Sequence, residues 1–268
     1  MSEFAVEFDK VAFYRQGRCI YENLSCRIPR GKITAILGPS GTGKTTMLHL
    51  IGRLIKAKSG QINVLNNRLD RLKKNEMLAL RQRMGVLFQS GALFSHLSVY
   101  DNVAFPVRQN SDLCEELIHT LVMMKLEAVG LRGAHRLMPA ELSGGMARRV
   151  ALARAIALDP EILMYDEPFT GQDPISLKVI LDLIKTLNDT LGLTSIIVSH
   201  DIEEVLSIAD HVIVVADRRL AIEGSSAEVY NSKDPFIHQF LHGDSDGPIA
   251  FHYPCESMHT MLSNGERR

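Results

Sequence analysis

Long apolar segments are missing from this sequence, whose longest apolar runs are only as long as a single strand. A helix needs about 20 consecutive apolar residues to cross a membrane, so we expect any membrane role to be peripheral and to depend on a partner. Residues 1–4 do not resemble the start of a cleavable secretion signal. C-x-x-C pairs are also missing, because the four cysteines stand apart at Cys19, Cys26, Cys114 and Cys255. Neither a zinc site nor a disulfide framework is expected, in keeping with a reducing cytoplasm.

An excess of charge of either sign is lacking as well, since 30 basic residues stand against 31 acidic ones and the net charge is −1. A protein that binds nucleic acid through a broad basic surface would carry a clear positive excess, so we expect no nucleic acid partner. The hydrophobic content of 46% and the charged content of 23% are those of an ordinary globular protein. A chain of 268 residues can form one large α/β core, or a core with a subdomain.

The most informative stretch is a glycine-rich loop at residues 38–45, which matches G-x-x-x-x-G-K-[ST] without a gap. Residues 32–37 before it have the composition of a buried strand, and an apolar-periodic helix follows it. Glycines allow successive backbone N–H groups to turn toward an anion, and the helix adds its positive N-terminal end. Lys44 would contact the β- and γ-phosphates, and the Thr45 hydroxyl would bind Mg²⁺. The sequence therefore predicts a nucleoside triphosphate site formed by Gly38, Pro39, Ser40, Gly41, Thr42, Gly43, Lys44, Thr45 and Thr46.

Short apolar bursts alternate with polar residues between residues 4 and 35, and residues 29–31 end the run with a turn signal. This pattern predicts an antiparallel sheet that leads into the strand before the glycine-rich loop. Tyr14 is the aromatic residue best placed to stack on a nucleobase. It could equally pack on the sheet, because aromatic residues also serve well in cores.

The middle of the chain changes from strands to helices. Residues 59–64 and 84–89 are predicted to form strands, and the basic stretch between them is predicted to form the solvated face of a helix. From residue 90 to about 160 the pattern is helical, which predicts a helical insertion into the α/β core. Met123 and Met124 lie in this insertion, where we expect them to fill the core rather than to contact a cofactor.

A second helix start carries a serine followed by two glycines, Ser143, Gly144 and Gly145. Ser143 is a natural N-cap, and the glycines leave the first-turn N–H groups open to an incoming anion. An ordinary capped helix would not need both glycines, because each weakens the first turn. The pattern favours a second phosphate-contacting helix end, with a plain cap as the alternative.

Polar side chains end three of the predicted strands, at Gln89, at the pair Asp166 and Glu167, and at His200. The carboxyl ends of parallel strands face the ligand crevice. Asp166 could hold Mg²⁺ there, and Glu167 could orient and polarise the attacking water. Carboxylates at such a position can instead cap a helix. A histidine at a strand end is often structural, but the expected place of His200 beside Glu167 favours a contact with the γ-phosphate.

These motifs in this order resemble the nucleotide-binding subunits of ABC transporters over residues 4–241. The matching parts are Walker A at 38–45, the Q-loop at Gln89, the signature at 142–146, Walker B at 162–166 with catalytic Glu167, and the switch histidine His200. The resemblance implies a P-loop NTPase α/β fold of the ABC type, with an antiparallel β subdomain and a helical subdomain.

The same resemblance implies a site for ATP and Mg²⁺, in which Gln89 joins Thr45 and Asp166 at the metal. It implies further that two copies of the chain sandwich two ATP molecules. Each ATP would lie between the glycine-rich loop of one copy and the Ser143–Gly145 turn of the other.

Two departures from the family pattern narrow the resemblance. Met146 stands where most members have Gln, and residues 170–174 read Thr-Gly-Gln-Asp-Pro where Ser-Ala-Leu-Asp is usual. With the Ala-Arg-Arg that follows the signature and the tail at 246–254, these features resemble the ATPases of MCE-associated Mla phospholipid transport systems. That implies three further partners, an integral inner-membrane permease, an MCE-type lipid-binding protein and a small STAS-type subunit. The ATPase would then lie at the cytoplasmic face of the inner membrane.

Two other functions stay open. The same cassette could power a transporter for another solute, since the cassette never touches the cargo. A non-transport ABC ATPase, for example in iron–sulfur assembly, is the other alternative. Such ATPases usually carry tandem cassettes, coiled coils or cysteine ligands, and the sequence shows none of these.

We expect the ATPase domain to span residues 1–241 and residues 242–268 to form a C-terminal extension. The Gly, Asp, Ser and Pro content of the extension favours a flexible tail. Phe251 and Tyr253 form an aromatic cluster within it, however, and such residues often anchor interfaces. The sequence thus also allows the tail to dock on a second copy of the chain.

Overall fold

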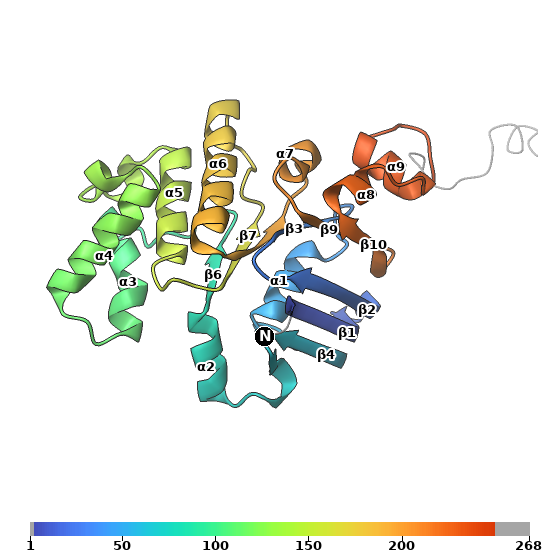
Figure 1. The fold of residues 1–268 in the computed structure, drawn as a ribbon, viewed down its shortest axis with the longest axis horizontal. Coiled ribbons are helices and arrows are strands. Elements are labelled where there is room, and N and C mark those ends of the chain that lie inside the picture. The colour runs from blue at the N-terminus through green and yellow to red at the C-terminus, as the bar shows by residue number, and fades with distance from the viewer. Residues whose placement is uncertain (1–2, 250–268) are drawn as a thin grey trace, which may run out of the picture. The chain divides into compact units, whose positions relative to one another are not determined.

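The computed structural model describes residues 3–249 (Figure 1). The chain divides into two compact units, with the boundary in the sequence between Val229 and Tyr230. The first unit contains both β-sheets. The expected end of the ATPase domain at residue 241 falls inside the second unit.

Four strands form a sheet in the order β2-β1-β4-β5, with antiparallel pairing throughout, as the N-terminal pattern predicts. Their bounds are β1 Phe4–Arg15, β2 Arg18–Pro29, β4 Ser59–Val64 and β5 Asn67–Arg68. Buried and exposed side chains alternate along most of β2, so one face of this sheet packs inward and the other meets solvent. Met47 and Leu50 share the buried cluster of this sheet. They belong to α1 (Lys44–Ile51), the helix that follows the glycine-rich loop (Figure 1).

A second, six-stranded sheet has the order β10-β9-β3-β8-β7-β6. Its strands are β3 Ile33–Leu37, β6 Met84–Leu87, β7 Ile162–Asp166, β8 Thr194–Val198, β9 His211–Ala216 and β10 Arg219–Ser225. All the pairings are parallel except that of β10 with β9. Every residue of β3 and of β8 is buried, as expected for strands that are covered on both faces. The carboxyl ends of β3, β6, β7 and β8 therefore lie along one edge of the sheet.

Helices surround this second sheet. The remaining helices of the first unit are α2 Lys74–Gln82, α3 Val99–Asn110, α4 Glu115–Ala128, α5 Gly144–Ala155, α6 Pro174–Leu191, α7 Ile202–Leu206 and α8 Ser226–Tyr230, whose last residue belongs to the second unit. Short 3₁₀ turns occur at η1 Leu69–Arg71, η2 Arg132–Ala134 and η3 Pro139–Glu141. Helices α3, α4 and α5 lie together at one end of the unit, beyond β6 (Figure 1), as the helical insertion predicts. None of the helices between residues 3 and 249 is long and apolar enough to cross a bilayer.

The prediction that the methionines of the insertion fill the core is wrong for Met124, whose side chain is 67% exposed. The buried face of α4 consists instead of Ile118, Val122 and Leu126, which follow the helical spacing of four residues. Met124 points to the other side and lines a groove between α4 and α6. Periodicity indicated a helix here but did not indicate which of its faces is buried.

The second unit contains α9 (Pro235–His242). Asp234 caps the helix by accepting from the N–H groups of Phe236 and Ile237, and Gly243 ends it in the left-handed conformation. Residues 250–268, which include the predicted docking residues Phe251 and Tyr253, lie outside the described part of the chain.

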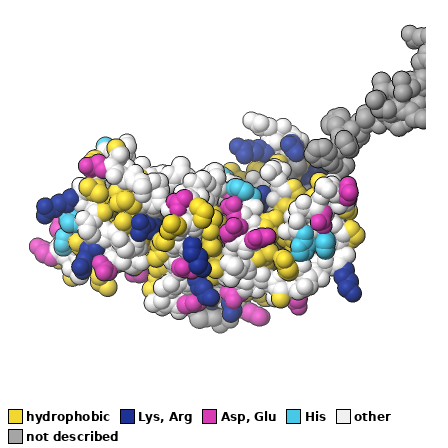
Figure 2. Space-filling view, turned by 90° about the horizontal axis from the view of Figure 1, so that it is seen from above, with side chains coloured by type: hydrophobic (Ala, Val, Ile, Leu, Met, Phe, Trp, Pro, Cys, Tyr) yellow, Lys and Arg dark blue, Asp and Glu magenta, His cyan; other side chains and the backbone are white. Residues whose placement is uncertain are grey.

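Basic and acidic side chains are interspersed over the face of the molecule that Figure 2 shows, with hydrophobic side chains between them. Positive charge on this face is thus divided into small groups, which matches the balanced composition of the chain.

Candidate nucleotide site

The carboxyl edge of the six-stranded sheet brings together the loops in which the sequence predicts site residues. The glycine-rich loop follows β3, Gln89 follows β6, Glu167 follows β7 and His200 follows β8. The register confirms their proximity, because Val198 of β8 pairs with both Ile36 and Asp166. The topology thus places residues that are far apart in the sequence at one crevice.

The glycine-rich loop has the backbone that an anion site requires. Gly41 and Gly43 have φ values of 79° and 100°, a left-handed conformation that other residues adopt only with strain. Gly43 is the N-cap of α1 and brings no side chain to block the first-turn N–H groups. A Cβ at Gly43 would lie 2.6 Å from Ile20 Cγ2 and 2.9 Å from the Tyr21 hydroxyl. The loop therefore fits a phosphate, and the close packing beneath it explains why glycine is needed at this position.

Lys44 lies inside the loop. Its Nζ donates to the carbonyl oxygens of Gly38 at 2.7 Å and Pro39 at 3.2 Å, and the residue is only 9% exposed. Burial lowers the pKa of Lys44, while the nearby carboxylates of Glu167 and Asp166 oppose that shift. The ammonium group is thus held at the glycine-rich loop, where it would make a direct charged contact with a phosphate.

Tyr21 supports the loop from below and was missed in the sequence analysis. Its side chain is fully buried, and its hydroxyl donates to the carbonyl oxygen of Gly43 at 2.5 Å. Burial raises the pKa of Tyr21, so the hydroxyl stays protonated and remains a donor. The one available signal was its place in an apolar burst, which does not distinguish a core tyrosine from one that supports a loop.

Thr45 and Asp166, two of the predicted metal ligands, are brought into direct contact. The Thr45 hydroxyl donates to Asp166 Oδ1 at 2.8 Å. A hydroxyl and a carboxylate oxygen are ligands that Mg²⁺ prefers, so Thr45 and Asp166 would be suited to hold the ion here. The third predicted ligand, Gln89, follows the neighbouring strand β6, and its side chain is exposed.

Glu167 and His200 form a hydrogen-bonded pair. Glu167 Oε2 lies 2.7 Å from His200 Nδ1 and also accepts from the His200 backbone N–H at 3.3 Å. The Glu167 side chain is 16% exposed and that of His200 is 57% exposed. The pair therefore presents one sheltered carboxylate and one open imidazole at the crevice, which is a suitable arrangement for orienting a water molecule.

The backbone at Glu167 is left-handed, with φ 52°. A residue other than glycine adopts this conformation at a cost of about 1–3 kcal/mol, and such strain often marks functional sites. Here it turns the chain sharply at the end of β7, and the Glu167 N–H donates to Val198 O at 2.9 Å. No local sequence pattern indicates this turn.

Ser143 caps α5 as predicted, since its hydroxyl accepts from the Met146 N–H at 3.2 Å. A Cβ at Gly144 would meet no atom within 4 Å, so this glycine lies at an open surface. A Cβ at Gly145 would lie 2.9 Å from Ser176 Oγ, so α6 approaches α5 closely at this glycine. The open turn at Gly144 agrees with an anion-binding role, while Gly145 also lies against α6.

Tyr14 is 41% exposed, and Lys58 Nζ lies 4.4 Å from the centroid of its ring, so one face of the ring carries a cation. Asp173, in the unusual loop after Walker B, caps α6 by accepting from the N–H groups of Ile175 and Ser176. This cap gives a structural role to the acidic residue of that loop.

Comparisons with known proteins agree with this geometry. The ABC transporter family matches residues 21–170, which is more than half of the chain. The chain is 57% identical to the intermembrane phospholipid transport system ATP-binding protein MlaF of Haemophilus influenzae, over 96% of this chain and 97% of that protein. It is 52% identical to the protein of the same name from Escherichia coli K12, over 97% of each.

A solved structure supports the same assignment. It is the dimer of an ATP-binding cassette in a post-hydrolysis state, bound to ADP and Pi. It superposes with a TM-score of 0.75 at 30% sequence identity, over 82% of this chain and 98% of that one. The predicted fold class is confirmed by this likeness and by the observed sheets. From its motifs, its site and these relatives, we conclude that the chain belongs to the ABC transporter family, as an ATP-binding subunit with ATPase activity.

Proposed function

We propose that this chain hydrolyses ATP with Mg²⁺ to drive phospholipid transport by a permease in the inner membrane, at whose cytoplasmic face it lies. The observation that carries this proposal is the identity of 57% and 52% over nearly the whole chain to two proteins named for intermembrane phospholipid transport. A role in maintaining the lipid asymmetry of the outer membrane goes with that assignment.

The site supports hydrolysis by a division of roles. Thr45 and Asp166 would hold Mg²⁺, with Gln89 as a third ligand, and the metal would neutralise charge on the phosphates. Glu167, sheltered and bonded to His200, would orient the attacking water and accept its proton. Lys44 would stabilise the negative charge that develops on the transferred phosphoryl group.

A second copy of the chain would complete the site. The Ser143–Gly145 turn ends in open space at Gly144, so a nucleotide held by another copy could approach its free N–H groups. The dimeric cassette that resembles this chain is consistent with such an assembly. We propose that Tyr14 stacks on adenine, since its ring is partly exposed.

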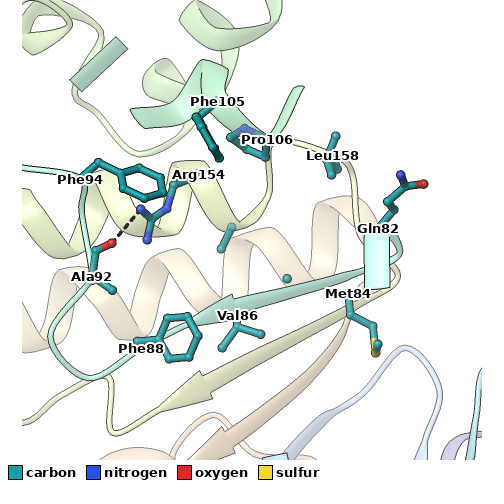
Figure 3. A pocket seen from close by; sticks show the side chains of 12 residues that line it. Gln82, Met84, Val86, Phe88, Ala92, Phe94, Phe105, Pro106, Arg154 and Leu158 are labelled. Atoms are coloured by element: carbon teal, nitrogen blue, oxygen red, sulfur yellow. Dashed lines mark hydrogen bonds between the residues drawn. The ribbon is translucent and has the colours of Figure 1, made fainter. Parts of the chain in front are cut away.

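A groove beside the Q-loop would receive a cytoplasmic helix of the permease (Figure 3). Its volume is about 380 Å³, and Phe88, Phe94 and Phe105 line it, each 37–41% exposed. The rings of Phe94 and Phe105 lie 4.8 Å apart, and Arg154 lies over Phe94 at 5.5 Å. Partly exposed aromatic residues with an arginine are typical anchors of interfaces. Phe88 and Phe94, which line the groove, lie close to Gln89 in the chain. A helix bound in the groove could therefore be coupled to the nucleotide site through this segment.

The remaining partners are an MCE-type lipid-binding protein and a small STAS-type subunit, which the resemblance in the signature and in residues 170–174 supports. A transporter for another solute is the alternative, since the cassette has no contact with the cargo.

Reconstitution would test the proposal. The complex that co-purifies with this chain from detergent-solubilised membranes is placed in vesicles, and ATP-dependent movement of a fluorescent phospholipid is measured. We expect movement with the unchanged chain and none with Glu167→Gln. Cross-linkers at residues 93–97 should reach an integral membrane subunit. Normal ATP hydrolysis with no phospholipid movement would contradict the cargo, and cross-links to soluble proteins alone would contradict the docking groove.

A further inference from the structure

Arg148 is a buried arginine on α5 that the activity described above leaves without a role. Only 9% of the residue is exposed. Among the ion pairs found between residues 3 and 249, none involves Arg148. A buried guanidinium without a carboxylate partner is costly unless many hydrogen bonds compensate for lost water. Burial accordingly lowers the pKa of Arg148.

The compensating bonds all go to backbone carbonyls of the nucleotide site. Arg148 Nη1 donates to Pro168 O at 2.6 Å and to Thr170 O at 3.0 Å. Arg148 Nη2 donates to Gln89 O at 2.7 Å. One side chain thus connects the segment that follows Glu167 with the residue predicted to reach the metal.

The bond to Pro168 matters because it acts on a strained turn. Glu167 has φ 52°, and a strained residue keeps its conformation only when surrounding contacts fix it. The Glu167 N–H is held by Val198 O on one side. On the other side, the carbonyl of the next residue is held by Arg148. Without Arg148, the turn would lose one of the two backbone contacts that direct the Glu167 carboxylate.

Arginine is suited to this task in a way that lysine is not. Its planar fork carries five N–H donors in fixed directions, so two nitrogens can serve different loops at once. A lysine ammonium in the same place is a point charge on a flexible stem and cannot hold both loops in a fixed relation.

We propose that Arg148 is a positioning residue for ATP hydrolysis, which fixes the backbone of Glu167 and that of Gln89 relative to each other. It touches neither nucleotide nor water and acts through Glu167. Its loss should therefore lower kcat while the glycine-rich loop continues to bind ATP, because Lys44 and its loop make no contact with Arg148 in the hydrogen bonds described.

The test measures kcat in the assembled complex and the Kd for ATP of the isolated full chain. We expect Arg148→Gln to lower kcat by about 10–100-fold, since a displacement of about 1 Å at a reacting centre can cost about 10²-fold. The Kd for ATP should change by less than about twofold, and Arg148→Lys should fall between the wild type and Arg148→Gln. Arg149→Gln is the matched control, because Arg149 also donates to a backbone carbonyl, that of Val129, away from the site.

A double-mutant comparison separates positioning from a general loss of structure. If Arg148 acts through Glu167, Arg148→Gln should change the residual rate of Glu167→Gln by less than about twofold. Wild-type kcat in Arg148→Gln would overturn the proposal, as would an equal loss in Arg149→Gln or a fully additive double mutant. If Arg148→Gln fails to fold, kcat is measured in Arg148→Lys instead. A wild-type kcat in Arg148→Lys would then overturn the proposal. Because only ATP hydrolysis and ATP binding are measured, the outcome is independent of the cargo.

Discussion

The bond between Tyr21 and the glycine-rich loop permits a quantitative prediction. Tyr21→Phe keeps the buried ring and removes only the hydroxyl that donates to Gly43 O at 2.5 Å. The Gly43 carbonyl also accepts from the Met47 N–H at 3.1 Å, so the substitution does not leave it without a partner. We therefore expect the loss of one net hydrogen bond, about 1 kcal/mol, rather than the larger penalty of an unpaired buried group.

The expected loss of about 1 kcal/mol determines how far the Tm and the Kd for ATP should change. A loss of about 1 kcal/mol should lower Tm by about 2–4 °C in a domain of this size. If the whole bond supports the binding conformation of the loop, the Kd for ATP rises by at most about fivefold, the factor that 1 kcal/mol represents. Thermal unfolding followed by calorimetry and ATP titration of the purified chain measure the two quantities.

Tyr230→Phe provides the control, because Tyr230 is 46% exposed and its substitution should change stability by less than about 0.5 kcal/mol. If Tyr21→Phe unfolded and bound ATP like the wild type, the hydroxyl would have no supporting role. If ATP affinity fell by far more than about fivefold, the loss of a single hydrogen bond could not explain the effect, and the reasoning would be wrong.

The remaining predictions concern the chemistry, the two sides of the site and pH. Glu167→Gln should keep ATP binding and slow phosphate release at saturating ATP by about 10²–10⁴-fold, the usual effect of a general base, and near-normal turnover would exclude that role. Lys44→Ala should weaken ATP binding by the isolated chain, because a direct charged contact is lost. Ser143→Ala should leave that binding unchanged but abolish hydrolysis, and equal loss of monomer binding in both variants would contradict the two-copy site. Hydrogen bonds from Ser176 lower the pKa of Asp173 in the folded chain. The contribution of Asp173 to stability should therefore be complete above its unfolded-state pKa of about 4 and disappear as pH falls through the lower folded value, so Asp173→Asn should flatten the acid side of the Tm profile.

The elements that the sequence predicts well are those fixed by neighbours in the chain. The bounds of β4 agree with the predicted strand at 59–64. Ser143 caps its helix as predicted because a cap requires only a hydroxyl and an N–H three residues later. The glycine-rich loop is equally local, since its strand, its turn and its helix are continuous in the sequence. Periods and caps depend on separations of a few residues, which a sequence displays directly.

The contacts that support the site join positions far apart, and no local pattern contains them. Tyr21 and Gly43 are separated by 22 positions, and Arg148 and Gln89 by 59. In the sequence Arg148 looks like one more charge on a helix, where a solvated face is the usual explanation. Its burial depends on the packing of α5 against the loops that follow β6 and β7, and only the tertiary fold determines that packing.

The turn at Glu167 shows how local preference and tertiary structure compete at the site. A left-handed conformation is unfavourable for glutamate, so the local sequence alone would relax this turn. Three contacts oppose that relaxation, and each comes from a different part of the chain: Val198 O, the Arg148 guanidinium and His200 Nδ1. A glycine at this position would remove the strain, but it would also remove the carboxylate that hydrolysis requires. The strain therefore persists because the reacting group and the sharp turn are needed at the same residue, and the buried arginine is part of what maintains it.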